Sequence, residues 1–167
     1  DFMSADFYAH IARVLEAGKF QLAFFDDRLG MPEFQSGRFA DAVEHGIRCV
    51  KMDPVACLMP MAMATERLGL GATYSTTYYE PFHVARLFAT LDHMTGGRIA
   101  WNIVTSLNST EARNMGRDDV AEHDERYDRA DEFLEVCYAL WEGSWDDDAV
   151  VRDRAARIYT RPGGVRP

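Results

Sequence analysis

Polar side chains of the kinds that bind ligands follow three short apolar runs of this sequence. Their residues are Asp26, Asp27, Ser75, Thr76, Thr77, Thr105, Ser106 and Asn108. If the three runs are parallel strands, their carboxyl ends share one edge, because the connections between parallel strands have a single hand. Ligands bind at that edge in sheets of this kind. The sequence therefore predicts a polar binding site built from the ends of successive strands.

His123 and Tyr127 are a second candidate pair. They are four residues apart near the start of a predicted helix, so both side chains lie on one helix face. The amino end of a helix attracts anions. The sequence by itself leaves open that His123 is an exposed helix residue without a binding role.

Signatures of several other chemistries are absent from the sequence. It has no GxGxxG, no GxxxxGK[ST], no HExxH and no GxSxG. The five histidines are far apart, so we expect no metal site. Three scattered cysteines form neither a disulfide framework nor a zinc pattern, which is typical of a reducing compartment, so we expect a cytoplasmic protein.

Helices and strands are predicted in alternation. The expected helices cover residues 5–18, 53–68, 81–95 and 121–142, and the expected strands cover 20–25, 70–77 and 98–105. Residues 28–52 are expected to form a long loop with one or two helical turns, 106–119 a polar loop, and the segment from Ser144 an irregular tail. This order indicates an α/β fold with crossover units on a parallel sheet.

Charge and hydropathy exclude some partners. The net charge is -9, and 13 of the 27 acidic residues lie between Asp118 and Asp148, opposed only by Arg126 and Arg129. Such a surface repels nucleic acid; it is either a solvated helix face or an acidic docking patch for a partner. The sequence has no apolar run long enough to cross a membrane and no visible secretory leader, so we expect no membrane association.

The length raises a difficulty for the predicted fold. Three parallel strands would leave two open sheet edges, and open edges promote pairing with other chains. A complete eight-stranded barrel needs about 250 residues, and this chain has 167. The chain is therefore interpreted as part of something larger.

Two long segments carry a resemblance to a known family. They are TYSTTYYEPFHVARLFATLDHMTGGRIAWNIVTS, residues 73–106, and EHDERYDRADEFLEVCYALWEGSWDDDAVVRD, residues 122–153. Together with AFFDDRLG and DPVACLMPMAMATERLGLGAT, they resemble the flavin-dependent monooxygenases of the bacterial-luciferase-like superfamily. The most similar branch contains nitrilotriacetate monooxygenase component A, dibenzothiophene-sulfone monooxygenase and long-chain alkane monooxygenase. The resemblance implies a partial TIM (β/α)8 barrel, roughly strands 2–4 with their helices, with residues 1–167 a fragment of one barrel domain.

The resemblance also implies roles for particular residues. Positions that match the family's flavin contacts are Asp27, Thr73, Thr105, His123 and Tyr127. Asn102 and Ser106 match positions near the reacting flavin ring, and we expect them to be catalytic. Alternatives remain open, because Asp27 also suits a turn and Thr73 is also a good strand former.

The activity implied by the resemblance is that of a two-component FMN monooxygenase. Reduced FMN would come from a separate NAD(P)H:flavin reductase, and O2 would supply one oxygen atom to a small organic substrate and the other to water. We expect a homo-oligomer. The alternative is a non-catalytic half-barrel remnant or assembly partner of a full-length relative.

The substrate stays open between a chelator, a sulfone and an alkane. The alkane branch carries a histidine where this sequence has Leu107, whereas the segment 138–153 leans toward that branch. Six aromatic residues either line a dry substrate pocket or belong to the core. They are Phe24, Phe25, Tyr74, Tyr78, Tyr79 and Trp101.

Overall fold

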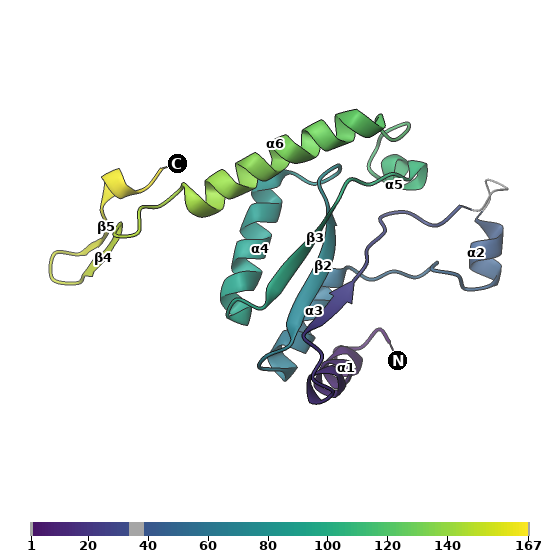
Figure 1. The fold of residues 1–167 in the computed structure, drawn as a ribbon, viewed down its shortest axis with the longest axis horizontal. Coiled ribbons are helices and arrows are strands. Elements are labelled where there is room, and N and C mark those ends of the chain that lie inside the picture. Colours follow the sequence, from purple (N-terminus) through teal and green to yellow (C-terminus); the bar gives the residue numbers. More distant parts are fainter. Residues whose placement is uncertain (1, 34–38, 167) are drawn as a thin grey trace.

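A three-stranded parallel sheet with helices against it forms the centre of the computed structural model, which describes residues 2–33 and 39–166 (Figure 1). The elements in chain order are α1 (Ala5–Ala17), β1 (Leu22–Phe25), α2 (Ala40–Glu44), α3 (Pro54–Ala64), β2 (Gly69–Ser75), α4 (Pro81–Thr95), β3 (Ile99–Val104), α5 (Ser109–Asn114), α6 (His123–Glu142), β4 (Val150–Asp153), β5 (Ile158–Thr160) and the 3-10 turn η1 (Pro162–Gly164). The predicted α/β alternation and the parallel sheet are confirmed.

The strand order is β1-β2-β3, and all pairs are parallel. Phe25 is paired with Ala72, and Thr73 is paired with Asn102. All three strands therefore end at the same edge, as crossover connections require.

One face of the sheet is covered by helices and holds the core. Its buried residues include Ala12 of α1, Leu58 and Met61 of α3, Phe88 of α4 and Phe133 of α6. Leu70 and Ala72 of β2 point into this cluster, so the alternate residues of the strand, Thr73 and Ser75 among them, point to the other face.

The opposite face of the sheet carries exposed apolar side chains on β1. Leu22 is 46% and Phe24 is 54% exposed, while Ala23 between them is buried. Asn102 and Ala100 of β3 are also exposed on this face. The helix-covered face is thus closed, whereas the opposite face, which we call the inner face, is exposed over β1 and β3.

Local sequence signals explain where the long helices begin and end. The Asp53 carboxylate accepts a hydrogen bond from the backbone N–H of Val55 at 2.9 Å, with Pro54 at the first position of α3. Pro81 begins α4, and Gly96 ends it in the left-handed conformation, at φ 65°. Both predicted starts and the predicted end are confirmed. Helix α3 ends at Ala64, a few residues before the expected end.

Two charged side chains fasten the turn before β2. The Glu16 carboxylate accepts hydrogen bonds from the backbone N–H groups of Glu66, Arg67 and Leu68. The bond from Arg67 does most to hold the pKa of Glu16 below its usual value. The Arg98 guanidinium donates to the carbonyls of Ala62 and Leu68 and to the hydroxyl of Thr65.

The prediction of a polar loop at 106–119 was wrong for residues 109–114, which form α5. Thr110, Glu111 and Ala112 are buried there, so the helix is stabilised by packing rather than by a periodic apolar pattern. The long loop predicted for 28–52 is confirmed for its described residues, with α2 as its helical turn; residues 34–38 lie outside them.

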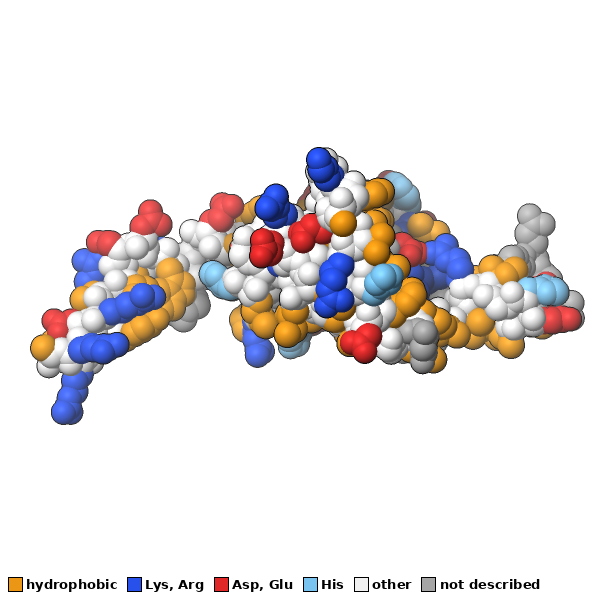
Figure 2. Space-filling view, turned by 90° about the horizontal axis from the view of Figure 1, so that it is seen from below, with side chains coloured by type: hydrophobic (Ala, Val, Ile, Leu, Met, Phe, Trp, Pro, Cys, Tyr) orange, Lys and Arg blue, Asp and Glu red, His pale blue; other side chains and the backbone are white. Residues whose placement is uncertain are grey.

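The prediction of an irregular tail was also wrong. Strands β4 and β5 form an antiparallel pair, followed by η1 and a bridge between Trp145 and Val165. This hairpin extends beyond the end of α6, away from the sheet, and α2 extends on the opposite side (Figure 1; Figure 2). Ala149, which directly precedes β4, is fully buried in this terminal segment.

Two further properties concern the surface of the described part of the chain. The acidic side chains of α6 lie exposed, which both a solvated helix face and a docking patch require. In residues 2–33 and 39–166 no helix combines the length and the apolar character that crossing a membrane requires.

Candidate functional site

The Thr73 hydroxyl links all three strands near their carboxyl ends. Its Oγ1 donates to the carbonyl of Phe25 on β1 at 2.9 Å and accepts from Nδ2 of Asn102 on β3 at 3.0 Å. Thr73 is 4% exposed, so its hydroxyl group makes both hydrogen bonds away from bulk water. Two residues predicted to share the site, Thr73 and Asn102, are thus in direct contact.

Ser75 and Ser106 form a second contact across the same edge. Their hydroxyl oxygens are 2.9 Å apart, and both residues are buried. A small cavity joins this pair to the first one, and its lining includes Asp27, Thr73, Ser75, Ser106 and Glu111. We call the residues Asp27, Thr73, Ser75, Asn102 and Ser106 the polar rim.

Asp27 enters the polar rim from the end of β1. Its Oδ1 accepts from the backbone N–H of Arg28 at 2.7 Å. Burial is the main reason that the pKa of Asp27 is raised, and the nearby charges of Asp53 and Asp26 act in the same direction. Asp26 turns away from the rim and pairs with Arg48 and Lys51, and the Lys51 ammonium is the main reason that its pKa is lowered.

Glu111 of α5 is a residue of this site that the sequence did not reveal. It is 4% exposed, and its Oε1 accepts from the backbone N–H of Leu29 at 3.1 Å. Its Oε2 is buried with no hydrogen-bond partner among the described residues. A glutamate in a polar segment gives no signal of burial, so only its tertiary contacts identify it.

Two arginines hold the start of α6 over the ends of β2 and β3. The Arg126 guanidinium donates to the carbonyls of Thr105 and Ser106 at 3.1 and 2.8 Å, and Arg129 donates to the carbonyl of Thr76. These bonds place the amino end of α6 beside the polar rim. The position of Thr105 is fixed through its carbonyl group.

His123 and Tyr127 lie at that end of α6, as predicted. Their ring centroids are 4.8 Å apart, and both side chains are exposed. The His123 Nδ1 lies 2.8 Å from the Asp124 carboxylate, and both groups face solvent. The pair is therefore accessible to a ligand; its flavin contact stays a prediction.

Five of the six aromatic candidates separate into two groups. Trp101 stacks on Phe88, with 5.4 Å between ring centroids, and its Nε1 donates to the carbonyl of Tyr74. Tyr74 stacks on Tyr79 at 4.2 Å, and burial raises the pKa of Tyr79. These residues pack against the helix-covered core, as does Phe25, whereas Phe24 lies on the inner face.

The polar rim suits a planar ligand with many donors and acceptors. It presents hydroxyls, an amide and a carboxylate on one edge, and buried polar atoms without partners lie in the same region. These atoms, among the described residues, are Thr77 Oγ1, Tyr78 OH and Glu111 Oε2. Buried polar atoms require partners, so their lack of one is a sign that a bound group or water supplies it. The residues present fit a flavin ring in this respect. In residues 2–33 and 39–166 no three His, Cys, Asp or Glu side chains are grouped as a metal site needs.

Comparisons with known proteins identify the family of this chain. Residues 3–167 match the family described as luciferase-like monooxygenase. The chain is 52% identical over 166 residues to a dibenzothiophene-sulfone monooxygenase of Rhodococcus erythropolis, covering 99% of this chain and 36% of that protein. It is 45% identical over 160 residues to a long-chain alkane monooxygenase of Geobacillus thermodenitrificans, covering 96% and 36%.

Solved structures give the same result. A crystal structure of a long-chain alkane monooxygenase superposes with a TM-score of 0.93 at 44% identity, covering 98% of this chain and 38% of that one. A riboflavin lyase with modified FMN and riboflavin superposes with a TM-score of 0.89 at 36% identity, covering 99% and 37%. The chain spans a little more than a third of the length of these relatives.

Proposed function

Because this chain belongs to the luciferase-like monooxygenase family, we propose that it is part of the catalytic subunit of an FMN-dependent monooxygenase. Reduced FMN is supplied by a separate NAD(P)H:flavin reductase, and the substrate is a small organic molecule. The observation that carries the proposal is the polar rim, where Asn102, Thr73 and the carbonyl of Phe25 form one hydrogen-bonded chain across three strands.

The fold proposed for the whole protein is a (β/α)8 barrel, of which residues 1–167 are a fragment containing about three strands. Two observations support it. Within the described residues, β1 and β3 each have one unpaired edge, and the inner face exposes Leu22 and Phe24. Further strands that continue the sheet would pair these edges and cover this face, as barrel closure does.

The polar rim is the proposed flavin site. Asp27 and Thr73 hold one side of the flavin, and Thr105, His123 and Tyr127 hold the other, at the amino end of α6. Asn102 and Ser106 contact the reacting part of the ring and are the proposed catalytic residues. The exposed Asn102 side chain is already oriented by its bond to Thr73, so little reorganisation is needed when a ligand binds.

Reduced FMN would supply the electrons for oxygen activation, with one oxygen atom transferred to the substrate and the other released as water. The role of the chain is to orient the ring and to exclude water. The raised pKa of Asp27 is consistent with a site that is partly shielded from solvent. Hydrogen bonds from Asn102 and Ser106 would fix which atoms of the ring face the substrate.

The test is an anaerobic titration of the purified protein with reduced FMN, followed by aerobic turnover with a flavin reductase and NADH. We expect saturable binding and oxygenation of a sulfone, alkane or chelator. Thr73→Val keeps the shape of the side chain but removes the hydroxyl, so binding should weaken. Thr90→Val is the matched control, because the Thr90 hydroxyl bonds only to its own helix, at the Arg86 carbonyl, on an exposed face. Equal FMN affinities of the two variants would contradict the proposed site.

A second candidate function is that of a non-catalytic half-barrel assembly partner. The unpaired edges of β1 and β3 favour it, because such edges pair with a second copy or with a full-length relative. Size-exclusion chromatography with light scattering separates the two. A homodimer that binds reduced FMN agrees with the monooxygenase, whereas a dimer without flavin affinity agrees with the partner role.

A further inference from the structure

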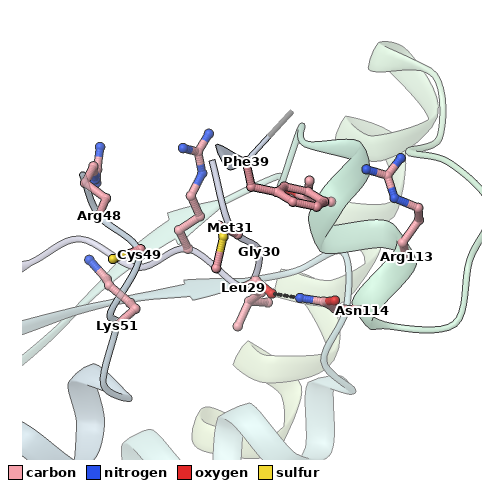
Figure 3. Close-up of a pocket in the computed structure, with 11 residues that line it drawn as sticks. Leu29, Gly30, Met31, Phe39, Arg48, Cys49, Lys51, Arg113 and Asn114 are labelled. Atoms are coloured by element: carbon pink, nitrogen blue, oxygen red, sulfur yellow. Dashed lines mark hydrogen bonds between the residues drawn. The ribbon is translucent and has the colours of Figure 1, made fainter. Parts of the chain in front are cut away.

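A second, larger cavity lies next to the polar rim, at the carboxyl end of β1 (Figure 3). Its volume is about 490 Å³. It lies between residues 28–31, residues 39–51 and the helix α5. Arg28 and Leu29 line both this cavity and the small cavity of the polar rim, so the two are neighbours.

The lining of the larger cavity is strongly cationic. Arg28, Arg48, Lys51 and Arg113 contribute four positive charges. Asp26 pairs with Arg48 and Lys51, and Glu33 pairs with Arg113, so two carboxylates offset four cations and two positive charges remain. Neither carboxylate lines the cavity. A cavity with this excess attracts an anion.

Arg28 is the cation best prepared for such a ligand. Its Nη2 donates to Oδ1 of Asn108 at 2.8 Å, and the ion pairs of the described residues give it no carboxylate partner. The rest of the guanidinium fork is therefore free for bidentate bonds to an oxyanion.

The segment that carries Arg28 is fixed to α5. The backbone N–H of Leu29 donates to Glu111, and Nδ2 of Asn114 donates to the carbonyl of Leu29 at 2.8 Å, the bond drawn in Figure 3. Gly30 lies so close to Thr110 that a Cβ atom would be 2.6 Å from its hydroxyl. Such a rigid wall lowers the entropy that is lost on binding.

The cavity also has an apolar wall. Leu29, Met31 and Phe39 line it, and Figure 3 shows Phe39 between the 28–31 segment and Arg113. An inorganic ion would leave this wall unused. The lining therefore fits a ligand with a charged group and an apolar body.

We propose that this cavity binds an organic anion through its carboxylate or sulfonate group, with the body of the ligand against Leu29, Met31 and Phe39. Because the polar rim is its neighbour, the bound anion is the substrate of the monooxygenase. The role as substrate rests on the proposed function, but the binding itself does not, since it requires no flavin.

The test is isothermal titration of the flavin-free protein with 2-naphthalenesulfonate and with its uncharged analogue, 2-naphthalenesulfonamide. We expect the sulfonate to bind about tenfold more tightly or better, and Arg28→Gln to remove about that factor for the sulfonate alone. Arg113→Gln, at a more exposed position, is the second variant, so that the result does not depend on the folding of the first. Arg86→Gln, on the exposed side of α4, is the matched control.

Three results would overturn the proposal. Equal affinity for the two ligands, or no effect of either lining variant on the sulfonate, would overturn it. A loss of affinity for FMN but not for riboflavin in Arg28→Gln would also overturn it, because the cavity would then hold the flavin phosphate. If the sulfonate binds as expected and reduced FMN does not bind at all, the anion site stands and the proposed function fails.

Discussion

Replacing Gly30 by alanine perturbs the 28–31 segment, which separates the polar rim from the larger cavity (the cationic cavity), without changing any charge. A Cβ atom at this position would lie 2.6 Å from Thr110 Oγ1, 2.7 Å from the backbone nitrogen of Glu111 and 2.8 Å from the carbonyl carbon of Thr110. Two of these three atoms are backbone, so no side-chain rotation relieves the contact. The 28–31 segment and α5 must therefore move apart.

Two effects set the magnitude. Overpacking of this kind costs about 1–3 kcal/mol. Separation also weakens the bond from the Leu29 N–H to Glu111, whose carboxylate is buried. We expect a loss of about 2–3 kcal/mol in the free energy of unfolding. For a chain of this size that corresponds to a fall in melting temperature of roughly 4–12 °C.

The assay is thermal unfolding followed by circular dichroism, with sulfonate titration on the same samples. Gly163→Ala is the matched control, because a Cβ atom at Gly163 meets nothing within 4 Å. Adding Thr110→Ala to Gly30→Ala should restore little, since the backbone contacts remain. Full recovery in the double variant, or a Gly30→Ala protein as stable as Gly163→Ala, would refute this reasoning.

Three more substitutions test individual contacts. Glu16→Gln should lower the melting temperature at neutral pH. Because the pKa of Glu16 is lowered in the folded state, its stabilisation is present above its unfolded pKa and is lost as pH falls through the folded value, so the difference should close below about pH 4. Asp27→Asn should do the opposite and raise the melting temperature at neutral pH, because the folded pKa of Asp27 is raised and its carboxylate becomes destabilising as pH rises from the unfolded pKa through the folded pKa. This gain should shrink as pH falls through the folded pKa and be absent below about pH 4. Arg98→Met removes side-chain bonds to the carbonyls before β2 and should cost about 2–3 kcal/mol in urea unfolding, whereas Arg86→Met should change little; similar values for the two would contradict the role given to Arg98.

Sequence patterns predicted the central layers of the fold because each of them leaves a local signal. The Asp53-Pro54 pair and the glycines after α4 mark helix ends by backbone chemistry that depends on no distant residue. The three apolar runs are recognisable because the strands of a parallel sheet pack helices on at least one face. The shared edge followed from connection handedness alone, and the Thr73–Asn102 contact agrees with it.

Features that depend on distant contacts were not predictable in this way. Helix α5 has six residues, and Thr110 and Glu111 in it are buried and contact the segment after β1, which is about 80 positions away in the chain. The cationic cavity gathers Arg28, Arg48 and Arg113 from separate parts of the sequence, so no spacing reveals it. The β4–β5 pair was missed because charged residues interrupt its apolar pattern.

The central claim is that the polar rim binds the flavin, and a crystal structure of the protein with bound FMN tests it most directly. The account predicts flavin density at the carboxyl ends of β1, β2 and β3, with ring atoms within hydrogen-bond distance of Asn102 and with Asp27 and Tyr127 at its border. Flavin density on the helix-covered face, or at the edge but without contact to Asn102 or Thr73, would contradict the account.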